Sequence, residues 1–456
     1  MKITDTVAAI SSAVGNSGIG IIRVSGDEAI DIVDKVFKSN SCLKSEETHT
    51  IHYGYIMDGD KEIDQVLVML MKAPRTFTGE DTVEINCHGG MLILKKVLDL
   101  VIKSGARAAD PGEFSKRAFL NGKMDLSQAE AVMDLINSKN DFALNSSIEQ
   151  LKGGVSREIK SIRENIIYHI AFIESALDDP EHISLDGYNE EISKMIDDNI
   201  EKIEKLISSF DNGRIKKEGI KTAILGKPNA GKSSLLNLLL GEDRAIVTDI
   251  EGTTRDTLEE NINFNGLSLN IIDTAGIRDT DDIVEKIGVN KAKEAAINSD
   301  LVIYVADGSR EIDNNDIEIL ELIKDRPAVI LVNKSDIESK ISIEELEKKA
   351  KRKVIEFSAR TGQGIEELEK VIKEMFYAGD VNYNDQVYIT NARHKEALNN
   401  AYNSLLQVRQ SVRDEMPEDF YSIDLMDAYA YLGLIIGESV EDDLVNEIFS
   451  KFCMGK

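Results

Sequence analysis

The feature that most constrains the fold of this chain is a glycine-rich segment, Gly226-Lys-Pro-Asn-Ala-Gly-Lys-Ser233, between a short apolar run and an apolar helical pattern. The run covers residues 221–225 and the helical pattern covers residues 234–240. A strand, a glycine-rich turn and a helix in this order form a phosphate-binding loop, because backbone N–H groups and the helix N-terminus face the anion. Lys232 is then placed to reach the β- and γ-phosphates, and the Ser233 hydroxyl to bind Mg²⁺. The segment predicts a nucleoside triphosphate site beside a parallel sheet.

The same rhythm of strands and helices continues over residues 216–378, which predicts a doubly wound, mostly parallel sheet. We expect its strands at residues 221–225, 269–272, 301–306, 328–332 and 354–357. Asn265-Gly266 is the dipeptide of a tight hairpin turn, so it predicts one antiparallel strand before the second of these. The whole range is expected to be a Ras-like P-loop domain.

Three more motifs follow predicted strands and indicate which nucleotide the domain binds. Asp273-Thr-Ala-Gly276 places a carboxylate near the metal and a glycine N–H near the γ-phosphate. In Asn333-Lys-Ser-Asp336, Asp336 can accept hydrogen bonds from guanine N1 and N2, while Lys334 covers the ring. A backbone N–H of Ser358-Ala-Arg360 can donate to guanine O6. This pattern selects guanine over adenine, so we expect GTP and GDP as ligands and GTP hydrolysis as the reaction.

The predicted GTP-binding positions lie in these motifs and in the segment between the first helix and the hairpin. They are Gly226, Asn229, Ala230, Gly231, Lys232, Ser233, Ser234, Thr248, Asp249, Ile250, Glu251, Gly252, Thr253, Thr254, Asp273, Thr274, Ala275, Gly276, Asn333, Lys334, Asp336, Ser358, Ala359 and Arg360. The segment Gly252-Thr-Thr-Arg-Asp256 resembles the first switch of translation-factor-related GTPases. Thr254 is therefore expected to bind Mg²⁺ together with Ser233.

One catalytic residue of many GTPases is missing from its usual place. Ile277, rather than Gln, follows Gly276, so the attacking water must be positioned in another way. The candidates are Glu285, acting through an additional water, and a cation in place of an arginine finger. Arg255 and Arg278 are alternatives, as arginine fingers supplied by the chain itself.

Two other patterns flank the predicted GTPase domain. Residues 1–120 alternate β-rich runs with two apolar-periodic helices, which predicts a compact α+β domain. Residues 121–212 and 380–456 carry long helical periodicity. We expect these two stretches to form one helical domain, into which residues 216–378 are inserted as an independent unit.

Composition narrows the environment and the partners of the chain. A formal charge of −28 and a pI near 4.7 argue against broad electrostatic binding of nucleic acid, so any RNA must meet a local patch or a partner protein. Cys42, Cys87 and Cys453 form no CxxC pair, which indicates neither a disulfide framework nor a zinc knuckle. The N-terminus lacks a signal-peptide pattern, and no apolar run approaches the roughly 20 residues of a membrane span. A cytoplasmic protein is expected.

The motifs and both ends of the chain together resemble the MnmE (TrmE) family of tRNA modification GTPases, over essentially all 456 positions. Outside the GTPase motifs, the resemblance is carried by Gly20-Ile-Ile-Arg-Val-Ser-Gly26, Thr76-Phe-Thr-Gly-Glu-Asp81, His88-Gly-Gly90, Pro111–Asn121 and Phe452-Cys-Met-Gly-Lys456. It implies a homodimer formed through the N-terminal domains. Each of these domains would bind a tetrahydrofolate derivative, 5-formyl or methylene, that supplies a one-carbon unit.

The folate-binding positions implied by the resemblance are Arg23, Glu80, Lys123 and Lys456. The three cations suit the carboxylates of a folate, and Glu80 can pair with the pterin N–H groups. For hydrolysis, the resemblance implies stimulation by K⁺ in place of an arginine finger, with G domains that meet across their switch faces. The implied K⁺ ligands are Asn229, Thr248, Ile250 and Thr253.

Three residues are expected to have catalytic roles: Lys232 at the phosphates, Glu285 at the attacking water, which the resemblance supports, and Cys453 in the terminal CxGK signature, which the resemblance alone implies. Cys453 would be a nucleophile of the modification chemistry or, alternatively, would shape the folate site. Cys87-His88 is similar to a Cys/His dyad, but adjacent residues on a strand point to opposite faces, which argues against it.

The implied function is a K⁺-stimulated GTPase that forms a heterotetramer with the flavoprotein MnmG. The pair would add an aminomethyl or carboxymethylaminomethyl group to C5 of the wobble uridine, position 34, of certain tRNAs. FAD and most of the RNA contact are then expected on the partner. A ribosome- or RNA-assembly switch, in which the GTP state controls docking without modification chemistry, is the alternative, and folate binding would distinguish the two.

Overall fold

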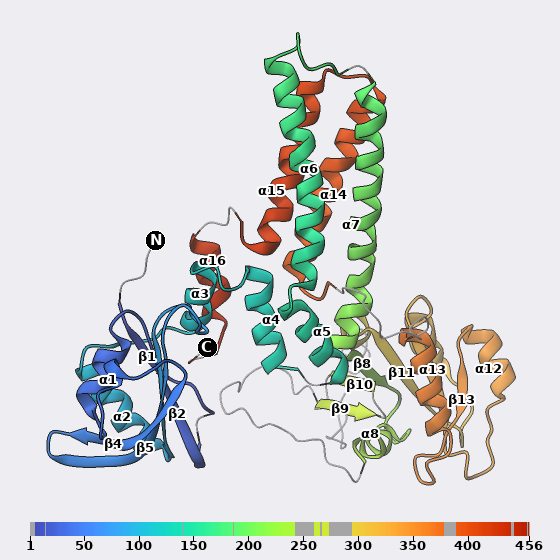
Figure 1. Cartoon of the computed structure of the whole chain (residues 1–456). Coiled ribbons are helices and arrows are strands. Elements are labelled where there is room, and N and C mark those ends of the chain that lie inside the picture. Colours follow the sequence, from blue (N-terminus) through green and yellow to red (C-terminus); the bar gives the residue numbers. More distant parts are fainter. Residues whose placement is uncertain are drawn as a thin grey trace. The chain divides into compact units, whose positions relative to one another are not determined.

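The computed structural model describes residues 5–13, 15–138, 140–185, 187–241, 260–264, 267–272, 294–377, 389–438, 442–453 and 455. The chain divides into two compact units (Figure 1). The first unit contains residues 1–137, 146–204 and 393–456, and the second contains residues 138–145 and 205–392. No helix within the described ranges is both long and apolar enough to span a bilayer.

The first unit begins with a seven-stranded sheet in the order β3-β4-β5-β6-β2-β1-β7. Its strands are β1 (Val7–Ile10), β2 (Ser17–Ser25), β3 (Phe37–Lys38), β4 (Thr50–Asp58), β5 (Lys61–Met71), β6 (Thr82–Gly89) and β7 (Arg107–Ala108). Its helices are α1 (Ala29–Val36) and α2 (Met91–Lys103), with a short 3₁₀ turn, η1 (Leu43–Ser45). Neighbouring strands are antiparallel, except β1 and β7, which are parallel. This is the α+β fold expected from the alternating runs.

The core of this sheet lies on the face covered by α1 and α2. On β5, Val66, Val68 and Leu70 are buried in that core, whereas Leu67 between them is exposed. This period of two is that of a strand with one buried face. Strand β4 was not predicted, because Gly54 interrupts its pattern. A Cβ at Gly54 would lie 2.5 Å from the Lys38 carbonyl, so the close approach of β3 explains the glycine.

Helices from both ends of the chain complete the first unit. They are α3 (Glu113–Leu120), α4 (Leu126–Ile136), α6 (Gly154–Asp178), α14 (Ala392–Arg413), α15 (Glu418–Ile436) and α16 (Asp442–Ser450). Two further helices, α5 (Asp141–Leu151) and α7 (Tyr188–Glu218), belong partly to each unit. Helices α6 and α15 lie side by side (Figure 1), where the Arg163 guanidinium packs 3.9 Å from the Tyr429 ring centre and pairs with Glu438 at 2.6 Å. Helices far apart in the sequence therefore form one bundle.

The second unit contains a six-stranded sheet in the order β13-β12-β11-β8-β10-β9. Its elements are β8 (Ile220–Leu225), α8 (Lys232–Leu240), β9 (Glu260–Phe264), β10 (Leu267–Ile272), β11 (Leu301–Asp307), α11 (Asn314–Leu322), β12 (Ala328–Asn333), α12 (Ile343–Ala350), β13 (Val354–Glu356) and α13 (Ile365–Tyr377). All strand pairs are parallel except β9 with β10. The five predicted strands and the antiparallel excursion are confirmed.

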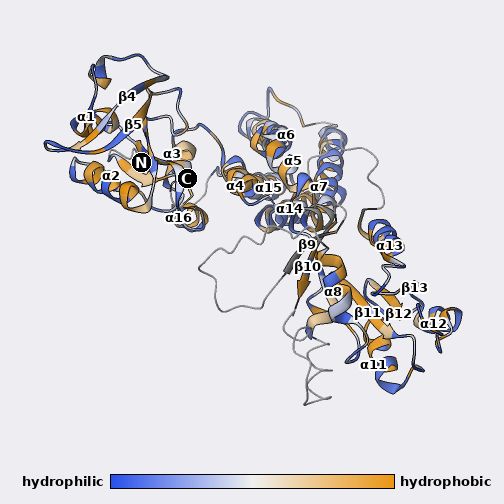
Figure 2. Ribbon diagram, turned by 90° about the horizontal axis from the view of Figure 1, so that it is seen from below, coloured by the Kyte–Doolittle hydropathy of each residue, from blue (hydrophilic) through white to orange (hydrophobic). Residues whose placement is uncertain are grey.

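This second sheet is buried on both faces, as a doubly wound sheet requires. Along β11, Leu301, Ile303 and Val305 pack in the core that includes α8 and α13. The alternate residues Val302 and Tyr304 pack in the core that includes α11 and α12. Figure 2 shows the consequence, since these hydrophobic strands are flanked by helices with a hydrophilic outer side.

Candidate functional site

The phosphate loop joins β8 to α8, as the sequence predicts. Gly226 has a φ of +150° and a Cβ there would lie 2.4 Å from the Val305 carbonyl, so only glycine fits beside β11. The Lys232 ammonium donates to the carbonyls of Gly226 and Lys227, both at 2.8 Å, so it closes the loop on itself. Burial lowers the pKa of Lys232 below its usual 10.5. These carbonyl contacts are weaker partners than phosphate oxygens, so the ammonium is suited to exchange them for a nucleotide.

Asn333 braces the phosphate loop against the other nucleotide motifs. Its Nδ2 donates to the Ala230 carbonyl at 2.8 Å, and its Oδ1 accepts from the Ala359 N–H at 3.0 Å. Gly231 precedes α8 with a φ of +103°, and a Cβ there would lie 2.0 Å from Asn333 Nδ2. The glycine is therefore required twice, for its backbone conformation and for this contact. The brace brings the loops after β8, β12 and β13 together.

The loops after β12 and β13 carry the groups expected to read the base. Asp336 accepts from the Ser358 hydroxyl at 2.8 Å, which fixes one carboxylate oxygen. The Arg360 guanidinium lies 3.9 Å from the other oxygen and is largely exposed. Lys334 has a φ of +68° and its ammonium pairs with Asp307 at 2.7 Å. Burial raises the pKa of Asp307, but hydrogen bonds from Lys334 and Ser309 outweigh it and lower the value.

An ion-pair cluster that was not predicted from the sequence holds the phosphate loop on the side of α11. The Lys227 ammonium pairs with Asp313 at 2.5 Å and with Asp316 at 2.7 Å. Asp316 also accepts from the buried Tyr304 hydroxyl at 2.5 Å. The loop is thus tied to the N-terminus of α11. The spacing Asp313-x-x-Asp316 is that of a helix N-cap, so the sequence could have predicted that these two acids lie at the start of a helix. Nothing in the local sequence indicates that Lys227 pairs with them.

Several predicted positions fall outside the described residues. They are residues 248–254, residues 273–276, Glu285 and Lys456. Of the phosphate-loop residues, Asn229 has a φ of +62°, a conformation that asparagine adopts more readily than most residues. Ser233 and Ser234 lie in the first turn of α8. The expectations for Mg²⁺, K⁺ and the attacking water therefore stay predictions.

A second polar site lies in the N-terminal sheet, around Arg23 on β2. The Arg23 guanidinium pairs with Glu84, directly across on β6, at 2.8 Å. It lies over the rings of Phe77 and Phe114, at 5.7 and 5.5 Å from their centres. Its Nη1 also faces the Gly455 carbonyl at 3.5 Å. The chain terminus is thus brought to a strand near the start of the sequence.

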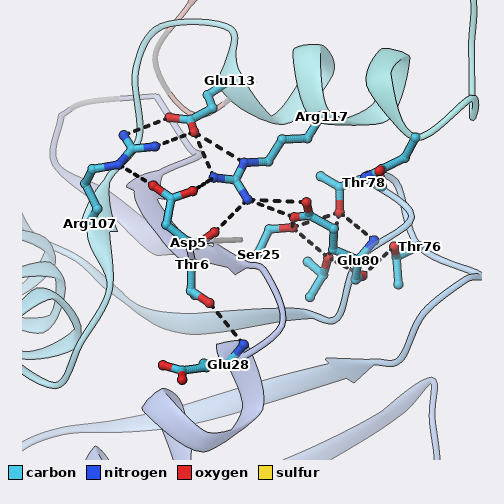
Figure 3. Close-up of polar contacts among 12 residues, drawn as sticks. Asp5, Thr6, Ser25, Glu28, Thr76, Thr78, Glu80, Arg107, Glu113 and Arg117 are labelled. Carbon is cyan, nitrogen blue, oxygen red and sulfur yellow. Dashed lines mark hydrogen bonds and ion pairs between the residues drawn. The ribbon is translucent and has the colours of Figure 1, made fainter. Parts of the chain in front are cut away.

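Glu80 occupies the loop between β5 and β6, beside Arg117 of α3 (Figure 3). Its carboxylate accepts from the Ser25 hydroxyl at 2.9 Å and from the Arg117 guanidinium at 3.2 Å. Lys123 follows α3, and its ammonium donates to the Pro74 carbonyl of the same loop at 3.0 Å. Arg23, Glu80 and Lys123 therefore gather around the loop of residues 74–80, which the Phe77 ring joins to Arg23.

The C-terminal segment docks on the start of α3. Phe449 and Phe452 are buried, with ring centres 5.0 Å apart. Gly112 has a φ of +68°, and a Cβ there would lie 2.5 Å from the Phe449 carbonyl. The Ser11 hydroxyl donates to the Gly455 carbonyl at 3.1 Å, which fixes the end of the segment. The two phenylalanines therefore anchor the C-terminal segment in a small core shared with α4.

Cys453 and Cys87 differ in their exposure to solvent. The Cys453 thiol is exposed on the docked segment. The Cys87 thiol is buried, and this burial raises its pKa to about 11, which disfavours a thiolate. The His88 ring pairs with Asp64 at 2.6 Å, on the other side of the strand from Cys87. The two residues do not form a dyad, as the strand geometry predicted.

A doubly wound sheet that ends in a phosphate loop, an Asn-Lys-x-Asp motif and a Ser-Ala loop defines a P-loop GTPase. The family model described as MnmE helical domain matches residues 126–453, and the model described as GTP-binding protein TrmE N-terminus matches residues 6–123. A tRNA modification GTPase MnmE of Lachnoclostridium phytofermentans is 55% identical, over 99% of this chain and 100% of its own. That of Acetivibrio thermocellus is 50% identical, over 99% of this chain and 99% of its own. That of Clostridioides difficile is 47% identical, over the whole of both chains, 100% of each. The chain belongs to the MnmE family of tRNA modification GTPases.

Among solved structures, the G domain of the T. maritima FeoB iron transporter is similar to part of the chain. It is 31% identical, with a TM-score of 0.26, and the match covers 34% of this chain and 97% of that one. The family assignment rests on the sequence relatives, which extend over the whole length.

Proposed function

We propose that this chain is a K⁺-stimulated GTPase that works with the flavoprotein MnmG on the wobble uridine of certain tRNAs. The pair adds an aminomethyl or carboxymethylaminomethyl group to C5 of uridine 34 and takes one carbon from a tetrahydrofolate derivative. The observation that carries the proposal is the presence of two separate polar sites in one chain. One is the braced phosphate loop, and the other is the cluster around residues 74–80.

In the GTPase domain, Lys232 would exchange its two carbonyl partners for the β- and γ-phosphates. Ser233, in the first turn of α8, suits Mg²⁺ as a hydroxyl ligand together with Thr254. Mg²⁺ would neutralise charge on the phosphates. Asp336, held by Ser358, would accept from guanine. These assignments use oxygen and ammonium groups that match the chemistry of a magnesium nucleotide.

For K⁺, an oxygen donor is needed next to the phosphates. The amide of Asn229 fits this requirement, because it lies in the phosphate loop three residues before Lys232. We assign Thr248, Ile250 and Thr253 as the other ligands. The cation would supply the positive charge that an arginine finger supplies elsewhere, and Glu285 would order the attacking water.

The second site fits a reduced folate in its donor set. A pterin presents N–H donors, which the fixed Glu80 carboxylate can accept. The glutamate end presents carboxylates, whose charge suits Lys123 and the terminal Lys456. The Arg23 guanidinium lies over the rings of Phe77 and Phe114, so a planar ligand would meet a partly apolar surface. Bound there, the folate would supply the one-carbon unit, while Cys453 would shape the site or act as a nucleophile.

The outer face of the N-terminal sheet supports a homodimer. Ile51 and Tyr53 on β4 are 59% and 55% exposed, and Leu67 on β5 is 47% exposed. Tyr53 stands directly opposite Leu67, and Ile51 directly opposite Met69, so the apolar side chains form adjacent cross-strand pairs. An exposed apolar group of this kind suits an isologous contact with a second copy.

The charge of the chain agrees with a partner protein that carries most of the RNA contact. With a net charge of −28, this protein would leave most of the tRNA contact, and the FAD, to MnmG in a heterotetramer. A role in tRNA modification would require the protein to be in the cytoplasm with its tRNA substrates.

The decisive experiment is nucleoside mass spectrometry of bulk tRNA from a deletion strain. The strain is complemented with the wild type, with Lys232→Ala, or with Lys370→Ala as a control for an exposed lysine of the same domain. We expect C5-modified wobble uridines to vanish on deletion and to return with the wild type and the control only. Unchanged nucleosides in the deletion strain would refute the modification role, and full rescue by Lys232→Ala would refute the need for GTP.

A further inference from the structure

A buried guanidinium, that of Arg117, contacts the Glu80 carboxylate. The Arg117 side chain is fully buried on α3, and its Nη1 donates to both carboxylate oxygens of Glu80, at 3.3 and 3.2 Å. Its Nη2 donates to Asp5 at 2.8 Å and to Glu113 at 2.9 Å (Figure 3). One cation thus joins the segment before β1, helix α3 and the loop of residues 74–80.

A second arginine shares part of this cluster. Arg107 on β7 pairs with Glu113 at 2.6 Å and with Asp5 at 2.7 Å. Within the contacts that the structure describes, Arg107 does not reach Glu80. Both arginines therefore pair with Asp5 and Glu113. Of the two, Arg117 is the one that also contacts Glu80. This difference provides a matched comparison within one cluster.

We propose that Arg117 is a positioning residue of the folate site: it fixes the Glu80 carboxylate in the orientation that receives the pterin. This inference rests on the proposed function. The Arg117 Nη1 group and the Ser25 hydroxyl together take three of the roughly four acceptor positions of the carboxylate and hold its plane. The Glu80 side chain is 11% exposed, so it is not fully enclosed by the protein.

The contacts with Arg117 hold the Glu80 carboxylate in one orientation. A free glutamate side chain rotates about three bonds, and its immobilisation on binding costs free energy. Arg117 cannot relax toward solvent, because its side chain is 0% exposed and carries three acidic partners. The carboxylate is therefore oriented before any ligand arrives, which is how supporting residues sharpen a binding site.

The test compares Arg117→Lys with Arg107→Lys in the full chain. Lysine keeps the positive charge, which protects folding, but its single ammonium cannot serve three carboxylates in the fork geometry of arginine. Dissociation constants are measured by calorimetry for 5-formyltetrahydrofolate and by NMR for p-aminobenzoylglutamate, which lacks the pterin. The GTPase rate reports whether the rest of the chain is intact.

We expect Arg117→Lys to weaken 5-formyltetrahydrofolate binding about 10-fold, the loss of roughly one charge-assisted hydrogen bond. Its affinity for p-aminobenzoylglutamate should stay within about 2-fold, because that fragment does not reach Glu80. Arg107→Lys should leave both affinities within about 2-fold. Glu80→Gln should weaken the folate alone, and adding Arg117→Lys to it should cause little further loss.

Two results would overturn the inference while the folate site stands. One is folate binding by Arg117→Lys equal to wild type, when Glu80→Gln binds more weakly. The other is an equal loss for both ligands in both arginine variants, which would assign Arg117 to general stability. No binding of 5-formyltetrahydrofolate by the wild type at millimolar concentration would instead refute the proposed function itself.

Discussion

A buried cluster of charged residues joins the two helical stretches, and its contribution to the stability of the first unit can be tested. Glu130 on α4 is buried, and its carboxylate accepts from Arg393 at 2.9 Å and from His394 at 2.8 Å, both near the start of α14. Arg393 also donates to the Leu434 and Ile435 carbonyls near the end of α15. We expect Glu130→Gln to destabilise this part of the first unit more than any exposed Glu→Gln change.

The size of the effect follows from the pKa of Glu130. Burial raises this pKa, but His394 and Arg393 outweigh burial and lower it from 4.5 to about 2. Each tenfold change in proton affinity corresponds to about 1.4 kcal/mol, so the ionised carboxylate contributes about 3 kcal/mol. Because the folded pKa is lowered, this stability is fully present above pH 4.5. It is lost as the pH falls from 4.5 toward 2.

The assay is urea unfolding followed by far-ultraviolet circular dichroism, at pH 7 and at steps down to pH 3. Hydrogen exchange at pH 7 locates the loss in α4 and α14. Glu447→Gln is the control, because Glu447 is exposed and pairs only one turn away, with the exposed Lys451 just after the end of α16. The reasoning fails if Glu130→Gln differs from the control by less than about 1 kcal/mol at pH 7, or if its difference from wild type does not shrink in acid.

Two further predictions concern the GTPase domain. Hydrolysis should be several-fold faster in KCl than in NaCl at equal ionic strength, and Asn229→Ala should abolish the difference, since it removes a proposed K⁺ ligand; equal wild-type rates in the two salts would contradict this. Gly231→Ala should weaken GTP binding about 10- to 100-fold in a nucleotide titration, because its φ is +103° and the new Cβ would clash with Asn333 Nδ2 at 2.0 Å. Gly362→Ala is the control, with a φ of +77° and nothing within 4 Å of its Cβ, and an equal loss there would refute the steric argument.

The parts of the fold predicted from the sequence are those with a strong local signal. The five strands of the second sheet appear as short apolar runs, because each is buried on both faces. Strand β4 was missed, since Gly54 and the half-exposed tyrosines around it break the pattern.

The candidate sites divide in the same way. The phosphate loop and the guanine motif were predicted because each function there requires particular residue types at a spacing set by one turn. The partners of these residues were not predictable. Lys227 meets Asp316, which lies 89 positions further along the chain, and nothing between them signals the contact. Arg23 was expected at a folate site, but its ion pair with Glu84 on the adjacent strand was not predicted.

What the sequence by itself determined is the chemistry: a guanine-nucleotide hydrolase of the MnmE family, with its phosphate loop, base motif and glycines in place. Those properties depend on neighbours along the chain, so they can be read there. Only the tertiary structure decided how Asn333 braces the loop, how Gly455 reaches Arg23, and how Arg117 holds Glu80 and Asp5 together. These contacts join residues from 37 to 432 positions apart, because burial in a shared core, and not spacing in sequence, brings such charges within hydrogen-bond distance.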